Sequence, residues 1–384
     1  MDTLLATSRA TSSPQLAVDL EAVAANARLF AERAAGELIA VVKADGYGHG
    51  AADVARTALA NGATRLGVTC IEEALALREA GLAAPILSWL NAVDADFQLA
   101  VDADVEIAVP SIEHLRAVIR TSGTARVHLH LDTGMARDGA MPTSWIDVCR
   151  LAREAEAQGQ IQVVGIMGHL GDADDPGAAS NSIGRALFEW GVDVARLSGL
   201  TPGILHLAAT SATLTLPGTH FTACRVGAGL VGIDLSRTTA LAQPLTLTAP
   251  VISVRKVSSG TPVGYGGDWV APRSTHLGLV GLGYADGLPR SASGHAEVLV
   301  RGRRMPVVGR MSMDQFVVDL GDSGAGVGEV VTVFGTGSAG EATVADWAEW
   351  AGTIPHEIVT RVGARVRRRV VGGEGAQRGG HASR

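Results

Sequence analysis

Apolar and polar positions follow a repeating pattern over the first 240 residues. From about residue 37 to 228, short β-branched runs alternate with longer segments rich in Ala, Leu, Glu and Arg, which is typical of strands followed by helices. The expected strands are Leu38–Val42, Arg65–Val68, Pro85–Ser88, Val105–Val109, Arg126–Leu131, Ile161–Ile166, Gly203–Leu207 and Ala223–Val226. The expected helices between them include Ala51–Ala60, Ile71–Ala80, Ile112–Arg120, Trp145–Ala157 and Ile183–Ser198. Eight alternations predict an α/β fold of the (β/α)8 TIM-barrel type, and a different count would fit a doubly wound open sheet.

After about residue 240 the pattern changes to short apolar runs separated by Gly, Pro and Ser. The expected strands here are Thr248–Val254, Leu277–Leu282, Glu297–Val300, Met305–Val308, Phe316–Leu320 and Glu329–Phe334. We therefore predict four parts: a disordered leader over 1–14, a barrel over 15–240, a mainly β domain over 241–372 and a disordered tail over 373–384.

Composition narrows the class of protein. The 384 residues are 47% hydrophobic, enough for two cores, yet the sequence has neither an apolar run long enough to span a membrane nor a secretory signal. Cys70, Cys149 and Cys224 lack metal-ligand spacing, so we expect no metal site and a reducing, cytoplasmic setting. The net charge of −7 gives no electrostatic case for nucleic acid.

Lysine is rare in this sequence. Of 32 basic residues only two, Lys43 and Lys256, are lysines. Arginine cannot be deprotonated in a protein, whereas a lysine amine can attack an aldehyde. Covalent aldehyde chemistry is therefore confined to two candidates.

The carboxyl ends of the expected strands carry polar side chains, and chemistry sits at that end of a (β/α)8 barrel. Lys43 follows the first strand directly, and Arg137 and His169 follow the fifth and sixth. After the seventh and eighth strands, the hydroxyl of Thr210 and the glycines near Gly227 suit a phosphate group. A phosphorylated cofactor together with an imine-forming lysine indicates pyridoxal phosphate.

Several motifs in this order resemble those of alanine racemases. The most specific is VVKADGYGHG, which is similar to the family's cofactor-lysine motif. The others are LAVDLEAVAANARLF (16–30), LDTGMARDG (131–139), HLAATSATL (206–214), CRVGAG (224–229), VGYGGDW (263–269), GLGYADGLPR (281–290) and VGRMSMDQ (308–315). The resemblance covers roughly residues 15 to 371.

The resemblance implies a role for each matched residue around pyridoxal phosphate. Lys43 would hold the cofactor covalently and act as the base on one face of the substrate. Tyr47 and Thr210 would hold the phosphate, together with main-chain amides near Gly227 and Ala228.

The remaining cofactor contacts implied by the resemblance involve the ring. Arg137 would bind the phenolic oxygen, and His169 would pack at the ring. Arg225, with His206 beside it, would donate to the pyridine nitrogen. An arginine there leaves that nitrogen without its proton, which favours reprotonation over side reactions such as transamination.

The second domain would supply the other base. By the resemblance, Tyr265 acts from the partner protomer on the opposite face, so we expect a homodimer with shared active sites. Tyr284, Met313 and Asp314 would line the entrance to the substrate site, where Arg137 also lies. Two bases on opposite faces suit racemisation, because one removes the α-proton and the other returns it.

The sequence departs from the family at several positions. His130 stands where many relatives carry a carbamylated lysine that braces the neighbouring arginine, so Arg137 must be held differently. His356, expected beside the cofactor phosphate, replaces a usual tyrosine. Ala209, Ala228 and Val231 replace a usual asparagine, a bulkier aliphatic residue and a tyrosine.

Two interpretations of these departures stay open. One is drift with local compensation in an alanine racemase, and the other is a pocket for a different amino acid, such as serine or an amino acid of specialised metabolism. A pyridoxal-phosphate decarboxylase or aldolase would use the same architecture, but Tyr265 and Arg225 argue against both. A non-catalytic cofactor carrier would be expected to have lost Tyr265.

Overall fold

The computed structural model describes residues 13–372 and forms two compact units. One unit is Ala22–Ala242, and the other combines the chain up to Glu21 with the chain from Gln243 onward. Most of the predicted leader and the whole predicted tail lie outside the described residues. Within the described residues, no helix is both long enough and apolar enough to cross a membrane.

The first unit is built on eight parallel strands. In the sheet their order is β8-β7-β6-β5-β4-β3-β2-β9, so each strand from β2 to β7 pairs with the next one in sequence, and β9 pairs with β2. Their bounds are β2 Glu37–Val41, β3 Arg65–Val68, β4 Ile86–Ser88, β5 Val105–Val109, β6 Ala125–His130, β7 Ile161–Met167, β8 Ile204–His206 and β9 Ala223–Val226. Side chains along these strands are almost all buried, as expected where both faces of a parallel sheet are covered.

The sheet curls into a nearly closed barrel. β9 pairs in parallel with β2, and backbone bonds from Thr222 to Leu205 (3.0 Å) and from Arg225 to Ala208 (2.9 Å) join it to β8. The last strand therefore lies between the first and the seventh, which confirms the (β/α)8 barrel over an open doubly wound sheet.

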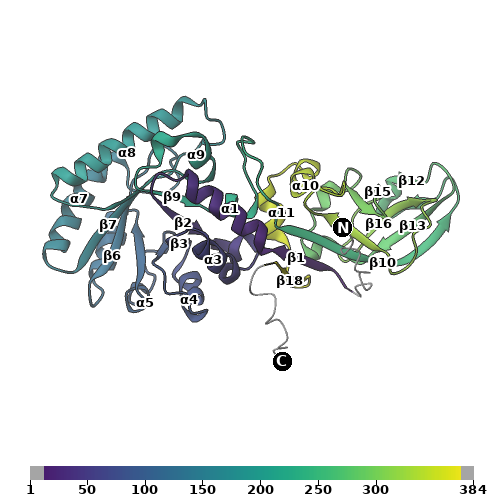
Figure 1. Cartoon of the computed structure of the whole chain (residues 1–384), viewed down its shortest axis with the longest axis horizontal. Helices are drawn as coiled ribbons and strands as arrows, with labels where there is room; N and C mark the ends of the chain where they lie inside the picture. Colours follow the sequence, from purple (N-terminus) through teal and green to yellow (C-terminus); the bar gives the residue numbers. More distant parts are fainter. Residues whose placement is uncertain (1–12, 373–384) are drawn as a thin grey trace, which may run out of the picture. The chain divides into compact units, whose positions relative to one another are not determined.

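Helices cover the outside of the barrel, as α7 and α8 do beside β6 and β7 in Figure 1. Their bounds are α1 Leu20–Arg33, α2 Lys43–Gly48, α3 Ala51–Ala60, α4 Ile71–Glu79, α5 Phe97–Asp102, α6 Ile112–Ile119, α7 Pro142–Ala157, α8 Ala179–Leu197 and α9 Thr210–Thr215. Short 3₁₀ turns are η1 Pro217–Thr219 and η2 Ala228–Val231. The longest, α8, turns residues such as Phe188 and Val192 into the core and leaves Arg185 and Glu189 in solvent, which is the amphipathic pattern of a covering helix.

The second unit is mainly β, as predicted. Its large sheet has the order β13-β16-β15-β14-β17-β10-β1-β18, and β11 and β12 form a separate hairpin. The bounds are β1 Gln15–Asp19, β10 Leu245–Val257, β11 Pro262–Val263, β12 Trp269–Val270, β13 Thr275–Val280, β14 Glu297–Val300, β15 Arg303–Val308, β16 Phe316–Gly321, β17 Val330–Phe334 and β18 Arg367–Val371.

One strand of this sheet comes from the start of the chain. β1 pairs antiparallel with β10 and in parallel with β18. The structure thus places residues 15–19 in the β unit, whereas the sequence prediction began the barrel at residue 15. The alternating pattern of QLAVD identifies a strand, but the sheet that a strand joins depends on distant partners.

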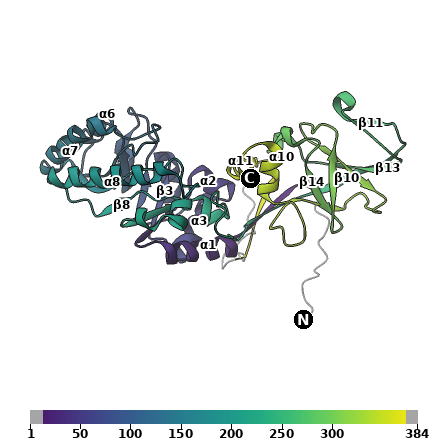
Figure 2. The ribbon, with the colours of Figure 1, turned by 90° about the horizontal axis from the view of Figure 1, so that it is seen from above.

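Two helices, α10 Val344–Ala351 and α11 Pro355–Arg361, pack together in the β unit, and Figure 2 shows them side by side. A capping box starts α10, because Thr343 accepts from the Asp346 amide and the Asp346 carboxylate accepts from the Thr343 amide. Pro355 occupies the first turn of α11, where its missing N–H costs no hydrogen bond. Turns η3 Tyr265–Gly267, η4 Tyr284–Asp286 and η5 Arg290–Ala292 complete the unit.

Candidate active site

The turn that carries Lys43 has a left-handed backbone. Directly after β2, residues 44 to 47 have φ between 51° and 62° and ψ between 39° and 51°. Only Gly46 among them tolerates this region freely, and each other residue costs about 1 kcal/mol. Such strain persists only where surrounding contacts determine the conformation, and it is concentrated at functional sites.

Contacts from two carboxylates hold this turn. The Ala44 amide donates to Glu73 Oε1 at 2.7 Å, and Asp45 Oδ1 accepts from the amide of Ala51 at 2.9 Å, at the start of α3. The other oxygen of Glu73 accepts from the amide and hydroxyl of Thr69. The turn is thereby tied to α4 and α3, and Lys43 is fixed at the carboxyl end of β2.

Lys43 lies in a partly buried and electropositive setting. Burial lowers its pKa, the nearby charges of Arg137 and Arg225 lower it further, and Glu73 opposes them. Its ammonium nitrogen lies 6.0 Å from the centre of the Tyr47 ring. A lowered pKa increases the fraction of neutral amine, which is the nucleophilic and proton-accepting form.

A cradle of small residues surrounds the Tyr47 hydroxyl. A Cβ added at Gly227 would lie 2.4 Å from that hydroxyl oxygen, and a Cβ at Gly229 would lie 2.3 Å from the ring of Phe30. The buried hydroxyl of Thr210 accepts from the Gly229 amide at 3.1 Å. Burial, followed by the charge of Glu73, raises the pKa of Tyr47, so its phenol stays protonated and can donate.

The buried guanidinium of Arg225 uses four of its five hydrogens within the barrel. Nη1 donates to His206 Nδ1 (2.9 Å) and to the carbonyl of His206 (2.7 Å). Nη2 donates to the carbonyl of Gly168 (2.7 Å) and contacts His169 Nδ1 at 3.2 Å. Among the described residues none accepts from Nε, so this N–H remains for a ligand acceptor.

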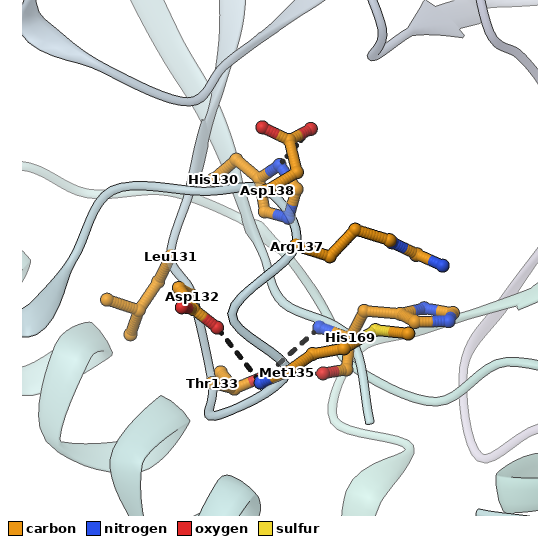
Figure 3. A pocket seen from close by; sticks show the side chains of 8 residues that line it. All are labelled: His130, Leu131, Asp132, Thr133, Met135, Arg137, Asp138 and His169. Atoms are coloured by element: carbon orange, nitrogen blue, oxygen red, sulfur yellow. Dashed lines mark hydrogen bonds and ion pairs between the residues drawn. The ribbon is translucent and has the colours of Figure 1, made fainter. Parts of the chain in front are cut away.

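Arg137 and His169 line one small pocket, together with His130, Leu131, Asp132, Thr133, Met135 and Asp138. In Figure 3 the side chains of Arg137 and His169 extend toward the same side, and His130 faces Asp138. The hydroxyl of Thr133 donates to the carbonyl of His169 at 2.7 Å and accepts from its amide at 3.1 Å. Burial first, and then the charge of Arg225, lower the pKa of His169 to about 3, so its ring is neutral.

These residues come from separate strands and meet at one end of the barrel. The charges acting on Lys43 include those of Arg137 and Arg225, and Arg225 contacts His169 directly. Ala228, the first residue of η2, is buried next to Gly227. The site therefore offers a nucleophilic amine, a hydroxyl cradle and a directed cationic donor, which together suit a phosphorylated aldehyde.

The other predicted site residues lie in the β unit. Tyr265 is 70% exposed, and Tyr284 and Met313 are also exposed. The Ala285 amide donates to the Met313 carbonyl, and Asp314 pairs with Arg365 at 2.7 Å.

The turn of Tyr265 packs against the same loop as Tyr284. A Cβ at Gly309 would lie 2.7 Å from the carbonyl of Val263, and Arg310 pairs with Asp268. Three motifs separated in sequence, around Tyr265, Tyr284 and Met313, thus meet within the unit. His356 lies half-buried near the start of α11.

Two contributors to the site were not predicted. Glu73 lies in the first turn of α4, and its carboxylate contacts the Lys43 turn only because α4 follows the next strand around the barrel. Asp138 follows Arg137 directly and lies beside His130, a position singled out from the sequence without a partner. Its place directly after Arg137 in the motif LDTGMARDG was the available signal for Asp138.

Comparison with known proteins identifies the family. The family models described as alanine racemase N-terminal domain and C-terminal domain match residues 18–234 and 244–370. An alanine racemase of Frankia casuarinae is 44% identical over 367 residues, covering 92% of this chain and 95% of that relative.

Solved structures agree with the sequence comparison. Alanine racemase from D-cycloserine producing Streptomyces lavendulae has a TM-score of 0.91 at 40% identity, over 94% of this chain and 98% of that one. Alanine racemase from Bartonella henselae with covalently bound pyridoxal phosphate has a TM-score of 0.85 at 25% identity, over 94% and 100%. The chain belongs to the alanine racemase family.

Proposed function

We propose that this protein interconverts L- and D-alanine, using pyridoxal phosphate held by Lys43. The observation that carries the proposal is the meeting of Lys43, the cradle around Gly227 and the donor Arg225 at the carboxyl end of one barrel. The relatives named alanine racemases, one of them with covalently bound pyridoxal phosphate, support this substrate and cofactor.

The residues present fit the cofactor. The Cβ-free surface of Gly227, the protonated phenol of Tyr47 and the hydroxyl of Thr210 would hold its phosphate. The remaining N–H of Arg225 would donate to its ring nitrogen, and Arg137 would bind its phenolic oxygen. When bound, pyridoxal phosphate supplies an electron-withdrawing ring that acidifies the α-proton of an attached amino acid.

Lys43 carries out the proton transfer on one face. Its lowered pKa increases the fraction of neutral amine that can accept the α-proton. Arg225 keeps a permanent hydrogen-bond donor at the ring nitrogen, because burial lowers its pKa only to about 10. A donor there excludes a proton on that nitrogen, which limits charge delocalisation and favours return of the proton to the α-carbon.

Tyr265 of a second copy would act on the opposite face, as the family resemblance implies. Its exposed position, with Tyr284 and Met313 from neighbouring segments, gives the β unit a cluster of exposed large side chains that a second copy can cover. Tyr284, Met313 and Asp314 would border the substrate entrance. We therefore propose a homodimer with shared sites.

The first experiment measures α-proton exchange in deuterated water for a panel of L- and D-amino acids, with the cofactor-loaded enzyme. Alanine is expected to exchange and racemise fastest. A higher rate with serine or another amino acid would contradict the assigned substrate, and exchange with none would contradict racemase activity.

A second experiment tests whether Lys43 holds the cofactor covalently. Lys43→Arg keeps the positive charge but removes the amine that deprotonates, so the absorbance of covalently held cofactor should disappear and activity should fall by about 10³-fold or more. Lys256→Arg makes the same change at the only other lysine, in β10, and should leave both unchanged. Covalent cofactor retained in Lys43→Arg would contradict the assignment.

A further inference from the structure

A buried network crosses the barrel interior behind the candidate active site. It consists of Glu106 on β5, His128 on β6, His206 on β8 and Arg225 on β9. His128 Nε2 lies 2.9 Å from Glu106 Oε2, and His128 Nδ1 lies 2.8 Å from His206 Nε2. His206 Nδ1 lies 2.9 Å from Arg225 Nη1. All four residues are at most 5% exposed.

The two ends of the buried network determine where every proton lies. Arg225 can only donate, so His206 Nδ1 must accept and its proton must sit on Nε2. His206 Nε2 therefore donates to His128 Nδ1, which leaves the proton of His128 on Nε2. That proton points to the carboxylate of Glu106, which can only accept. Donation thus runs in one direction, from Arg225 to Glu106.

The surroundings of Glu106 keep it an acceptor. Arg65 Nη1 lies 3.0 Å and 3.1 Å from its two oxygens, and Arg126 also pairs with it. Burial acts to raise the pKa of Glu106, but the hydrogen bond from His128 and these cations outweigh burial and lower that pKa to about 2. Burial lowers the pKa of both His128 and His206, so both rings are neutral.

Gly165 on β7 leaves the space that the ring of His128 occupies. A Cβ at Gly165 on β7 would lie 2.2 Å from His128 Nδ1, and the register between β6 and β7 shifts at the same place. An ordinary residue there would displace the ring from between its two partners. The barrel core is therefore shaped around the polar side chains.

We propose that Glu106 is a positioning residue: as the final acceptor of the hydrogen bonds that run from Arg225 through His206 and His128, it holds the Arg225 guanidinium in the orientation that leaves its Nε toward the cofactor ring. This inference rests on the proposed function for the role of Arg225. Glu106 contacts neither substrate nor cofactor and acts only through the two histidines. A carboxylate at the opposite end of the interior thus controls a group in the site.

Replacing Glu106 by Gln tests the direction of donation. The amide oxygen of Gln would face Arg65 and Arg126, so its NH₂ group would face His128 Nε2. Because Arg225 still donates at the other end, at least one contact of the buried network would then oppose two N–H groups, and the row of hydrogen bonds would be broken. We expect ¹⁵N spectra of histidine-labelled holoenzyme to show protons on Nε2 of both rings in the wild type and altered signals for these rings in E106Q, with kcat reduced on the order of tenfold and more transamination per turnover.

Arg126→Gln is the matched control, because it removes a cation from the same carboxylate without changing what His128 meets. Because Arg65 still pairs with both oxygens of Glu106, this variant should keep the protons on Nε2 of the two histidines, and its kcat should stay within about twofold of the wild-type value. Equal losses of kcat in R126Q and E106Q would overturn the proposal, because they would assign the effect to stability alone. Histidine ¹⁵N signals in E106Q identical to those of the wild type would also overturn it.

The wild-type spectrum keeps the proposal testable even when E106Q does not fold. A proton on Nδ1 of His128 or His206 in the wild type would overturn the assigned direction. The spectra require no turnover, so a wild-type protein that does not racemise alanine would contradict the proposed function and leave this readout interpretable. The two failures are therefore distinguishable.

Discussion

The imidazole of His130 lies 3.5 Å from the carboxylate of Asp138, on the loop that carries Arg137. His130 is buried and Asp138 is half-buried. Burial acts to raise the pKa of Asp138, but contact with His130 outweighs it and lowers that pKa. Where many relatives place a carbamylated lysine, this chain therefore places a histidine that faces the carboxylate of Asp138.

Asp138→Asn should disturb the loop that carries Arg137. The substitution keeps the size of the side chain but removes the charge that faces His130, so we expect kcat/KM for alanine to fall by about tenfold, as for loss of one charge-assisted contact. Steady-state kinetics in both directions measure the effect. Asp147→Asn, in an exposed i,i+3 pair on α7, is the matched control and should have no effect.

Because His130 stands in place of the family's usual lysine, we predict that racemase activity does not depend on carbon dioxide. An imidazole does not form the carbamate that a lysine amine forms, so removing bicarbonate from the assay should leave the rate of wild-type enzyme unchanged. A rate that depends on bicarbonate would show that another group near Arg137 is modified, and the role given to Asp138 would be wrong.

Tyr265→Phe tests the second base. Without the phenol, racemisation should fall in both directions by about 10²- to 10⁴-fold, because both directions pass through the same transition state. Solvent exchange of the α-proton should persist for one enantiomer only, since Lys43 still serves its face. Deuterium exchange of each enantiomer followed by mass spectrometry separates these outcomes.

Tyr284→Phe removes the same atom from a neighbouring exposed tyrosine. Since Tyr284 is assigned to the entrance, this variant should change KM and leave exchange of both enantiomers balanced. Symmetric loss of exchange in Tyr265→Phe would contradict its assignment as the base for one face.

Strand positions were predictable because they depend on local pattern. The bounds of β3, β5 and β9 agree with the expected ones, because each is a short apolar run that ends at turn residues. The count of eight then determined the barrel. The residues of β1 were assigned to the barrel because their partners, β10 and β18, lie more than 200 residues away in sequence and no local pattern identifies them.

The details of the site depended on contacts that no local pattern encodes. The left-handed turn contains Ala44, Asp45 and Tyr47, which do not favour that backbone and adopt it only because neighbouring elements hold them. The contact of Glu106 with His128 requires two adjacent strands in a particular register. The residue types at the strand ends predicted which side chains meet in the site. The hydrogen bonds between these side chains depend on the register of neighbouring strands, which the sequence pattern does not give.

Stability should fall with acid because the buried network contains two neutral histidines. Their folded pKa values lie below the ordinary 6.5, so the stabilisation is complete above about pH 6.5 and shrinks as pH falls. Each histidine should contribute a slope of up to about 1.4 kcal/mol per pH unit to the free energy of unfolding. Urea unfolding of the holoenzyme between pH 7.5 and 5 measures that slope.

His128→Gln removes one of these titrating groups and should reduce the slope by up to one proton's contribution. His295→Gln replaces an exposed histidine and should leave it unchanged. A slope that is the same in wild type and His128→Gln would mean that the folded protein protonates this ring as readily as the unfolded chain does.

The cradle around Tyr47 gives a prediction about cofactor affinity. A methyl group at Gly227 would lie 2.4 Å from the Tyr47 hydroxyl oxygen, so Gly227→Ala must displace that phenol or the loop. If the phenol donates to the cofactor phosphate, losing this contact to a charged group should weaken cofactor binding by about 10- to 100-fold. Fluorescence titration of the apoenzyme with pyridoxal phosphate measures the dissociation constant.

Gly203→Ala is the matched control, because an added methyl group there has no neighbour within 4 Å and the backbone needs no positive φ. It should bind the cofactor as the wild type does. Free inorganic phosphate separates the role of the cradle from that of Lys43, since it competes for the phosphate position without forming a covalent bond. Its inhibition constant should rise in Gly227→Ala by a factor similar to that for the cofactor, and an unchanged constant would place the phosphate elsewhere.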